Sequence, residues 1–288
     1  MNGLRLEAPT ALEYFAALVA EDASLPVLEA AIAVAQDEYP QLDPQTVLAQ
    51  IDALADTLLR RIPADAGALQ RLRLLNRYFF EELGFAGNVN DYYDPRNSYL
   101  PQVVATRRGI PLTLALLYVE LATQAGLTAA GVSFPGHFLV KLHMPRGEVV
   151  IDPFTGHSLS REQLDERLAP FRRQRGLVGD FEAPLGLFLQ AAPPRDVLAR
   201  LLHNLKEIHR AGEDWPRLLA VQQRLVLLLP DASEERRDRG LTWAELGRPA
   251  EAADDLAAYL AARPLADDAL ALRERLVELR RDGAPRLH

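Results

Sequence analysis

A histidine and an aspartate lie fifteen positions apart in the stretch "VSFPGHFLVKLHMPRGEVVIDPF", residues 132–154. His137 opens one strand-like run, and Asp152 ends the next. In many acyl-transfer enzymes a histidine acts as the general base and an acidic side chain orients it, while a third residue attacks the substrate. The chain contains no cysteine, so a nucleophile, if there is one, must be a hydroxyl or a water.

The register of the two runs predicts that the pair is in contact. If "MPRG" forms a tight turn with Met144 opposite Gly147, His137 falls opposite Phe154. Alternate residues of a strand share a face, so Asp152 becomes the diagonal neighbour of His137 on one face of an antiparallel sheet. We therefore expect a contact between the two side chains.

The remaining hydroxyls and histidines offer weaker candidates for chemistry. Ser98 and Ser133 are explained by helix-cap and turn roles. His143 shares the face of His137 and His157 follows Asp152, but no pair has the spacing of a known metal motif. We expect neither a metal nor a cofactor.

Composition excludes several classes of partner. The chain has 288 residues, with 32 basic and 40 acidic side chains and a formal net charge of −8. Such a balance repels a phosphate backbone, so we expect no nucleic-acid partner. No run is apolar enough to span a membrane, the N-terminus lacks a signal-peptide pattern, and the lack of cysteine excludes disulfides. The expected location is the cytoplasm.

Hydrophobic spacing divides the first half of the chain into helices and one polar loop. Residues 10–84 predict four helices, the third of which begins with Asp43 as N-cap and Pro44 at the first helical position. Residues 87–109 are polar and aromatic, and form either a binding lip or a self-bonded connection. Within this stretch Ser98 would cap a short helix that runs from Tyr99 to Arg107 and ends at Gly109.

A second group of elements follows this loop. Residues 111–125 predict a helix that is apolar on most sides and therefore central to the core. The runs 137–143 and 148–152 predict an antiparallel pair of strands.

The C-terminal part carries a repeat. Pro230 and Pro264 are 34 positions apart, which is the period of a tetratricopeptide repeat. Within the unit 233–266 a small residue, an aromatic, a turn glycine and a packing alanine fall at the expected places, at Gly240, Trp243, Gly247 and Ala252. Two units and a final helix are fewer than a free-standing solenoid needs, so we expect this array to pack on the preceding domain.

Three long motifs resemble one known family. The run "YYDPRNSYLPQVVATRRGIPLTLALLYVELATQAGL", then "GVSFPGHFLVKL" and "IDPFTG", closely resemble the transglutaminase-like proteins of the bacterial SirB family, which end in tetratricopeptide repeats. The resemblance runs from about residue 39 to 156 and weakly through the repeats. It implies a papain-like core in which a helix carrying the nucleophile precedes the strands that carry the histidine and the acid.

The same resemblance identifies what is missing. Transglutaminase-like domains place a cysteine at the start of this helix, and an ungapped alignment sets Pro111 on that cysteine. His137 and Asp152 match the family's histidine and aspartate. Thr113 lies about 200° around the helix from residue 111, so it should point away from the histidine, and a local hydrogen bond explains its hydroxyl more simply.

Several roles remain open for the residues of this chain that could carry chemistry. His137 and Asp152 are a hydrogen-bonded pair that stabilises the fold, a ligand-binding remnant of an ancestral cleft, or a working catalytic pair. Arg107 and Arg108 precede the helix and either grip an anion there or are ordinary solvated side chains. Tyr92, Tyr93, Arg96 and Asn97 are the candidate cleft-binding residues of the polar loop.

We therefore expect an α+β protein in three parts. These are a helical N-terminal subdomain (1–86), a transglutaminase-like core with a small antiparallel sheet (87–185), and tetratricopeptide-like helical hairpins (193–282). The expected function is that of a pseudoenzyme that acts as a protein-binding or regulatory module, with a protein or peptide partner bound through the cleft, the repeats or both. The alternative is an amide hydrolase or acyl transferase that uses His137, Asp152 and either Thr113 or a water.

Overall fold

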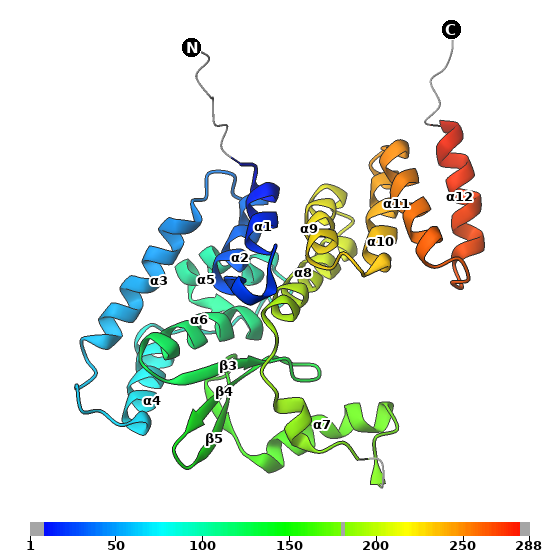
Figure 1. Cartoon of the computed structure of the whole chain (residues 1–288). Coiled ribbons are helices and arrows are strands. Elements are labelled where there is room, and N and C mark those ends of the chain that lie inside the picture. The colour runs from blue at the N-terminus through cyan, green and yellow to red at the C-terminus, as the bar shows by residue number, and fades with distance from the viewer. Residues whose placement is uncertain (1–8, 180–181, 283–288) are drawn as a thin grey trace, which may run out of the picture. The chain divides into compact units, whose positions relative to one another are not determined.

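The computed structural model describes residues 9–179 and 182–282, which divide into two compact units. The sheet unit comprises Pro26–Ala35 and Gln41–Leu201, and the repeat unit comprises Met1–Leu25, Gln36–Pro40 and Leu202–His288. Figure 1 shows the elements of both. The chain is thus mixed α and β with a helical C-terminal region, as its sequence predicts, while the three-part division at residues 86 and 193 stays a prediction.

The sheet unit begins with three helices that the periodicity predicts. They are α2 (Val27–Ala33), α3 (Pro44–Leu59) and α4 (Ala68–Asn76), and α4 continues into a π-helical turn. The Asp43 side chain accepts a hydrogen bond from the Gln45 amide at the start of α3, with Pro44 at the first helical position. The predicted N-terminus of this helix is therefore confirmed.

The short helix of the polar loop differs at both ends from its prediction. Helix α5 spans Leu100–Thr106, and its N-cap is Tyr99, whose side chain makes no capping bond. Ser98 lies inside the preceding 3₁₀ turn, so its predicted role as N-cap is wrong. The helix ends because Arg107 adopts a left-handed conformation (φ 60°), two residues before the glycine expected to end it.

The central helix is α6 (Pro111–Gln124), and it begins at its predicted proline. Ten of its fourteen residues are buried, which confirms the expectation of a helix enclosed on most sides. Burial of this many apolar side chains is the main source of stability for such an element.

The main sheet is antiparallel, with strands in chain order. Its strands are β3 (Thr128–Val132), β4 (Leu139–Met144), β5 (Gly147–Asp152) and β6 (His157–Leu159). Met144 pairs with Gly147, as the turn predicts. A second, parallel sheet joins β1 (Ala86–Gly87) to β2 (Arg108–Gly109). The prediction that His137 lies within a strand is wrong, because β4 begins two residues later.

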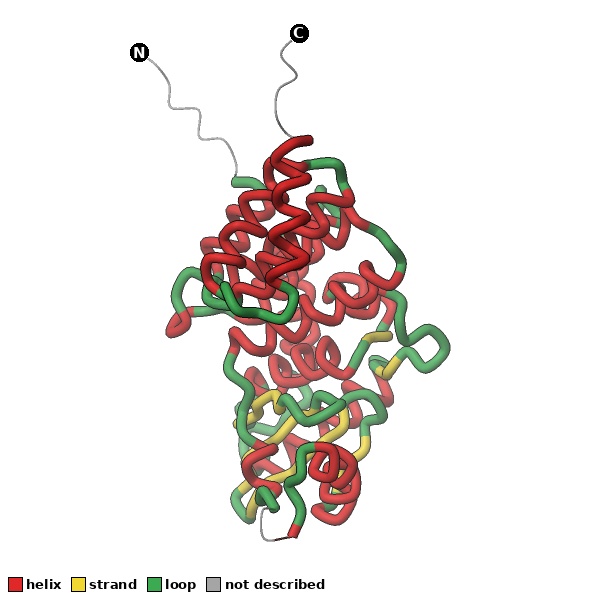
Figure 2. The backbone as a smooth tube through the Cα atoms, turned by 90° about the vertical axis from the view of Figure 1, so that its right-hand side faces the viewer, coloured by secondary structure: helices red, strands yellow, loops and turns green. Residues whose placement is uncertain are grey.

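Helices cover both faces of the antiparallel sheet. Helix α6 contacts β3 and β4 on one side, and α7 (Arg161–Gln174) lies on the other (Figure 1). On the α7 side Val132, Leu139 and Val150 form a buried cluster with Leu164 and Leu168 of α7. Figure 2 shows the strands of the antiparallel sheet gathered together, with helices around them.

The repeat unit is built from helical hairpins. Its helices are α8 (Pro194–Ala211), α9 (Trp215–Leu228), α10 (Ser233–Glu245), α11 (Pro249–Ala262) and α12 (Ala269–Asp282). The division between the two units falls within α8. The α10–α11 pair is the predicted repeat, with Gly247 at positive φ (68°) in its turn and Ala252 fully buried.

Buried charges join the first and second hairpins. The Lys206 ammonium donates to Glu235 at 2.6 Å and to Asp238 at 2.7 Å, and its side chain is 7% exposed. A lysine buried to this degree is costly unless paired, and here it meets two carboxylates.

Two N-terminal segments belong to the repeat unit. Helix α1 (Ala11–Leu18) packs against α9. The buried Arg224 guanidinium of α9 lies 5.4 Å from the centre of the Phe15 ring and forms an ion pair with Asp37. Arg217 adds hydrogen bonds to Glu38. Residues far apart in the sequence therefore complete one helical layer.

The contact of α10 with α11 is tight enough to require a glycine. A Cβ atom at Gly240 would lie 3.1 Å from both Asp255 and Leu256. We expect Gly240→Val to lower the free energy of unfolding by about 1 to 3 kcal/mol through overpacking. The measurement is urea unfolding. Gly212→Val is the control, since its nearest Cβ neighbour is at 3.5 Å, and equal losses would contradict the expectation.

Candidate functional site

His137 and Asp152 are in direct contact. His137 Nε2 lies 2.8 Å from Asp152 Oδ1. Asp152 is the last residue of β5, and His137 lies in the turn that leads into β4. The strand register brings the two together, because residues 139–144 and 147–152 pair across the tight turn.

The Asp152 carboxylate is buried and accepts three hydrogen bonds. Besides His137, the amide of Phe154 donates to Oδ1 at 3.0 Å, and Arg167 of α7 donates to Oδ2 at 3.1 Å. Only 2% of the residue is exposed. Burial raises its pKa, but the hydrogen bond and charge of His137, then Arg167 and the Phe154 amide, outweigh it and hold the pKa at about 2. The carboxylate is therefore ionised at neutral pH.

Arg167 was not found from the sequence. It comes from a helix that begins nine residues after Asp152, and its spacing to either partner follows no known motif. Only the packing of α7 on the sheet brings it to the carboxylate. The capping box of this helix, Ser160 with Gln163, was the available signal that a helix follows the strand.

The second ring nitrogen of His137 is available to a ligand. Its side chain is 24% exposed, and within residues 9–179 and 182–282 no group hydrogen-bonds Nδ1. When the ring is neutral, its proton lies on Nε2, which faces the ionised carboxylate, and Nδ1 presents a lone pair. Such a nitrogen can accept a proton from a water, or a hydrogen bond from a bound N–H group.

The start of α6 presents no free hydroxyl. Pro111 is its first residue and is buried. Thr113 is fully buried, and its hydroxyl lies 2.8 Å from the Asn97 carbonyl and 3.1 Å from the Ile110 carbonyl. The bond to Ile110 is the local one that a threonine in a first helical turn favours, whereas the bond to Asn97 ties the helix start to the polar loop.

The polar loop 88–98 is held by Asn97. This residue is 3% exposed, and its amide donates to the carbonyls of Asp91 and Tyr92 and accepts from Asn88. Asn97 therefore shapes the loop from within.

The other candidate residues of this loop face outward. Arg96 is an exposed side chain paired with Asp94. Tyr92 and Tyr93 are 45% and 77% exposed, and the Tyr92 ring lies 5.9 Å from that of Phe154, two residues after Asp152. Of the predicted loop residues, Tyr92 is the one that the structure brings to the His137–Asp152 pair.

Arg107 and Arg108 contact a different segment. The Arg107 guanidinium lies 4.7 Å from the centre of the Phe85 ring. Arg108 donates to the Gly84 carbonyl at 2.6 Å. Across the described ranges, neither side chain hydrogen-bonds His137 or Asp152.

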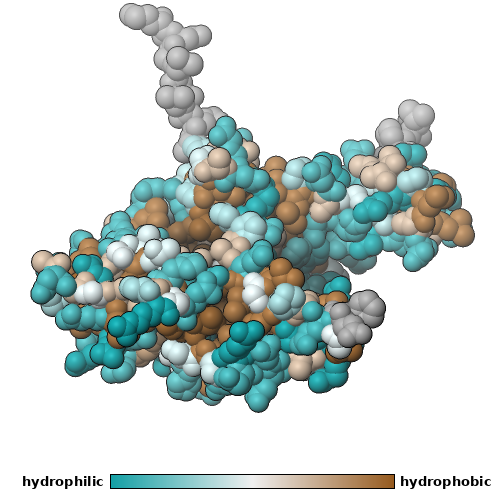
Figure 3. Space-filling view, turned by 60° about the horizontal axis from the view of Figure 1, so that its bottom comes forward, coloured by the Kyte–Doolittle hydropathy of each residue, from teal (hydrophilic) through white to brown (hydrophobic). Residues whose placement is uncertain are grey.

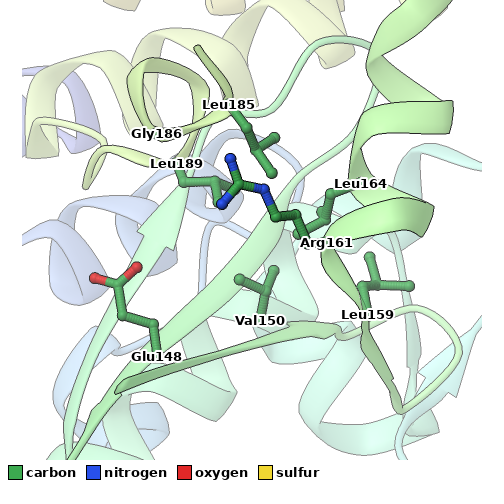
Figure 4. Close-up of a pocket in the computed structure, with 8 residues that line it drawn as sticks. All are labelled: Glu148, Val150, Leu159, Arg161, Leu164, Leu185, Gly186 and Leu189. Atoms are coloured by element: carbon green, nitrogen blue, oxygen red, sulfur yellow. The ribbon is translucent and has the colours of Figure 1, made fainter. Parts of the chain in front are cut away.

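A pocket lies on the same face of the sheet as Asp152. Glu148, Val150 and Asp152 alternate along β5 and so share that face. Figure 4 shows the pocket, with the Arg161 guanidinium above an apolar floor and Glu148 at one edge. Its volume is about 480 Å³, which suits one small ligand or side chain. The lining residues are Glu148, Val150, Leu159, Arg161, Leu164, Leu185, Gly186 and Leu189.

His143, His157 and the described helices add no further site. His143 lies 3.4 Å from Glu148, and His157 is exposed. In the part of the chain that the structure describes, no group of three His, Asp or Glu side chains could hold a metal ion. None of the described helices is long and apolar enough to cross a membrane.

Comparison with known proteins assigns the class of the sheet unit and of the helical array. Residues 45–203 match the transglutaminase-like superfamily, and residues 205–277 match the tetratricopeptide repeat. A UPF0162 protein of Xylella fastidiosa (strain 9a5c) is 38% identical over 260 residues, covering 90% of this chain and 92% of the relative.

More distant relatives carry the same family name. A UPF0162 protein of Pseudomonas aeruginosa is 30% identical over 91% of this chain and 94% of its own length, and one of Escherichia coli K12 is 27% identical over 78% of each chain. No solved structure matches. The chain therefore belongs to the UPF0162 family of transglutaminase-like proteins.

Acid should reveal the contribution of Asp152 to stability. Its pKa in the fold, about 2, is below that of a free aspartate. The ionised form thus favours the folded state above pH 4, and this contribution is lost as the pH falls toward 2. We expect it to be about 2 kcal/mol. Urea unfolding at several pH values should show that Asp152→Asn lacks this loss.

The control is Asp65→Asn, an exposed side chain without an ion-pair partner in the described ranges. It should follow the wild-type acid dependence. A parallel acid dependence of Asp152→Asn and wild type would contradict the assigned carboxylate.

Proposed function

We propose that this chain is a non-catalytic transglutaminase-like protein of the SirB type that binds a protein or peptide partner in the bacterial cytoplasm. One observation supports this most directly. The base and its orienting acid are in hydrogen-bond contact, yet the chain has no cysteine and a proline begins the helix that should carry one. The Thr113 hydroxyl is buried and bonded to backbone carbonyls, so it does not replace the thiol.

Surface features of the sheet unit and of the repeat unit each support binding. Tyr92 and Tyr93 expose aromatic side chains, which are enriched at interfaces. The neighbouring pocket has an apolar floor with charged groups at its edge. The tetratricopeptide hairpins add a second surface of a kind that commonly binds proteins, with Leu270 and Val277 exposed seven residues apart on α12. Figure 3 shows apolar patches on an otherwise largely hydrophilic face.

The assignment of residue 111 to the nucleophile position can be tested by introducing a cysteine there. In this cysteine-free chain, Pro111→Cys introduces a single thiol, and its rate of alkylation against pH reports its pKa. If residue 111 is the nucleophile position, His137 should lower the thiol pKa below the ordinary value of about 8.5. His137→Ala in the same background should raise it by roughly one unit or more.

Ala53→Cys, at an exposed position in the middle of α3, is the matched control and should be indifferent to His137→Ala. If the pKa of the residue-111 thiol were equally indifferent, the assignment of Pro111 to the nucleophile position would be refuted.

The second candidate function is hydrolysis by an activated water. The free Nδ1 of His137 and the ionised Asp152 behind the ring favour it, because this is the arrangement of a general base. It predicts saturable turnover of a simple ester or amide that His137→Ala abolishes. The non-catalytic proposal predicts that the wild type and His137→Ala give the same background rate.

Full-length variants can show which surface, the cleft or the repeats, binds a partner. Truncation before α9 would remove the helix against which α1 packs, so point changes are preferable. Capture by crosslinking from bacterial lysate should fall roughly fivefold or more with Tyr93→Ala if the cleft binds. It should fall with Leu270→Ser and Val277→Ser combined if the repeats bind.

Leu69→Ser, an exposed leucine of α4, is the control and should leave capture unchanged. A partner that all variants retain would place binding elsewhere, and the absence of any specific partner would count against a binding role.

A further inference from the structure

Arg200 of α8 lies against the turn that carries His137. Its Nη1 donates to the Ser133 hydroxyl at 2.7 Å and to the Phe134 carbonyl at 3.3 Å. The guanidinium carbon is 5.6 Å from the centre of the Phe138 ring. The Phe134 carbonyl also accepts the backbone N–H of His137 at 3.0 Å. Arg200 and His137 are therefore held by the same short turn.

Tyr92 connects Arg200 to the other side of the pair. Burial raises the pKa of the Tyr92 hydroxyl and the neighbouring Tyr93 adds to this, while the charge of Arg200 lowers it. The Tyr92 ring contacts Phe154, whose amide donates to Asp152. These contacts link Arg200, the turn 133–138, Asp152 and Tyr92. We call this set of residues the ring.

The charges in this ring do not balance. Asp152 forms an ion pair with Arg167 and a hydrogen bond with His137. Arg200 is half-buried, and none of the carboxylates in the described ranges lies within 4.0 Å of it. Burial lowers the pKa of its guanidinium. Removing a cation from water without a charged partner is costly. An anion that binds Arg200 would offset this cost.

Other arginines show the usual solution to this cost. The side chains of Arg172, Arg224 and Arg239 are 20% exposed or less, and each forms an ion pair with a carboxylate. Arg107 lacks a carboxylate partner in the described residues, but it packs over Phe85 and its Nη1 is buried. Arg71 is half-buried and donates to the carbonyls of Ala66 and Ala125, away from His137, so it is the matched comparison for Arg200.

We propose that this ring binds a carboxylate group of the partner, with the Arg200 guanidinium as counterion and the Tyr92 hydroxyl as a second donor. One guanidinium fork matches the single charge and planar shape of a carboxylate, whereas a phosphate calls for more positive charge. The free Nδ1 of His137 offers an acceptor to an N–H group of the same partner. This inference rests on the proposed binding function and names its ligand class.

The test is an NMR titration of the full chain with acetate, a bare carboxylate, at constant ionic strength against chloride. We expect saturable shifts of the Arg200 Nε–H and Tyr92 ring signals. Arg200→Gln should weaken binding roughly tenfold or more, and Tyr92→Phe severalfold. Arg71→Gln should leave the affinity unchanged. Amide spectra that are unchanged outside the site would show that each variant folds.

Two peptide pools distinguish the sources of the carboxylate. One pool has free C-termini and no acidic side chains, and the other has amidated C-termini and one glutamate. Arg200-dependent binding of either pool supports the proposal and identifies the source. Shifts that do not saturate, that persist in Arg200→Gln, or that inorganic phosphate produces more strongly than acetate would overturn it. The thiol measurement at residue 111 does not involve Arg200, so the two proposals can fail separately.

Discussion

The ionised carboxylate of Asp152 is the interaction on which the sheet unit's site depends. Its three donors come from the turn before β4, the backbone after β5 and helix α7. A charge buried to 2% exposure is tolerated only when it is paired and fully hydrogen-bonded. The need to satisfy this one group therefore fixes the orientation of the His137 ring and the position of α7 at the same time.

Under the proposed non-catalytic function, this dependence explains why the pair is kept. A histidine and aspartate that served only a reaction would be free to change once the nucleophile was gone. Here the loss of either partner leaves a buried polar group unsatisfied, at a cost of roughly 1 to 3 kcal/mol. The fold therefore depends on the pair, and the His137 side chain remains partly exposed.

Local patterns predicted the parts of the structure that local physics determines. The tight turn with Met144 opposite Gly147 set the register and hence the His137–Asp152 contact, and Asp43 with Pro44 marked the start of α3. The ends of α5 were missed, because a left-handed arginine ends it where a glycine was expected. Arg167 and Arg200 were missed because only tertiary packing brings their helices to the site, and no spacing in the sequence encodes such a contact.

The repeat unit combines segments from both ends of the described chain, and this affects the order in which its parts are synthesised and can fold. Phe15 of α1 rests on Arg224 of α9, about 200 residues further along the chain. At ribosomal rates of roughly 5 to 20 residues per second, α1 waits about 10 to 40 seconds for its packing partner to be synthesised. During that interval its apolar face is exposed while the sheet unit is completed between them. Folding of the repeat unit therefore follows synthesis of the sheet unit.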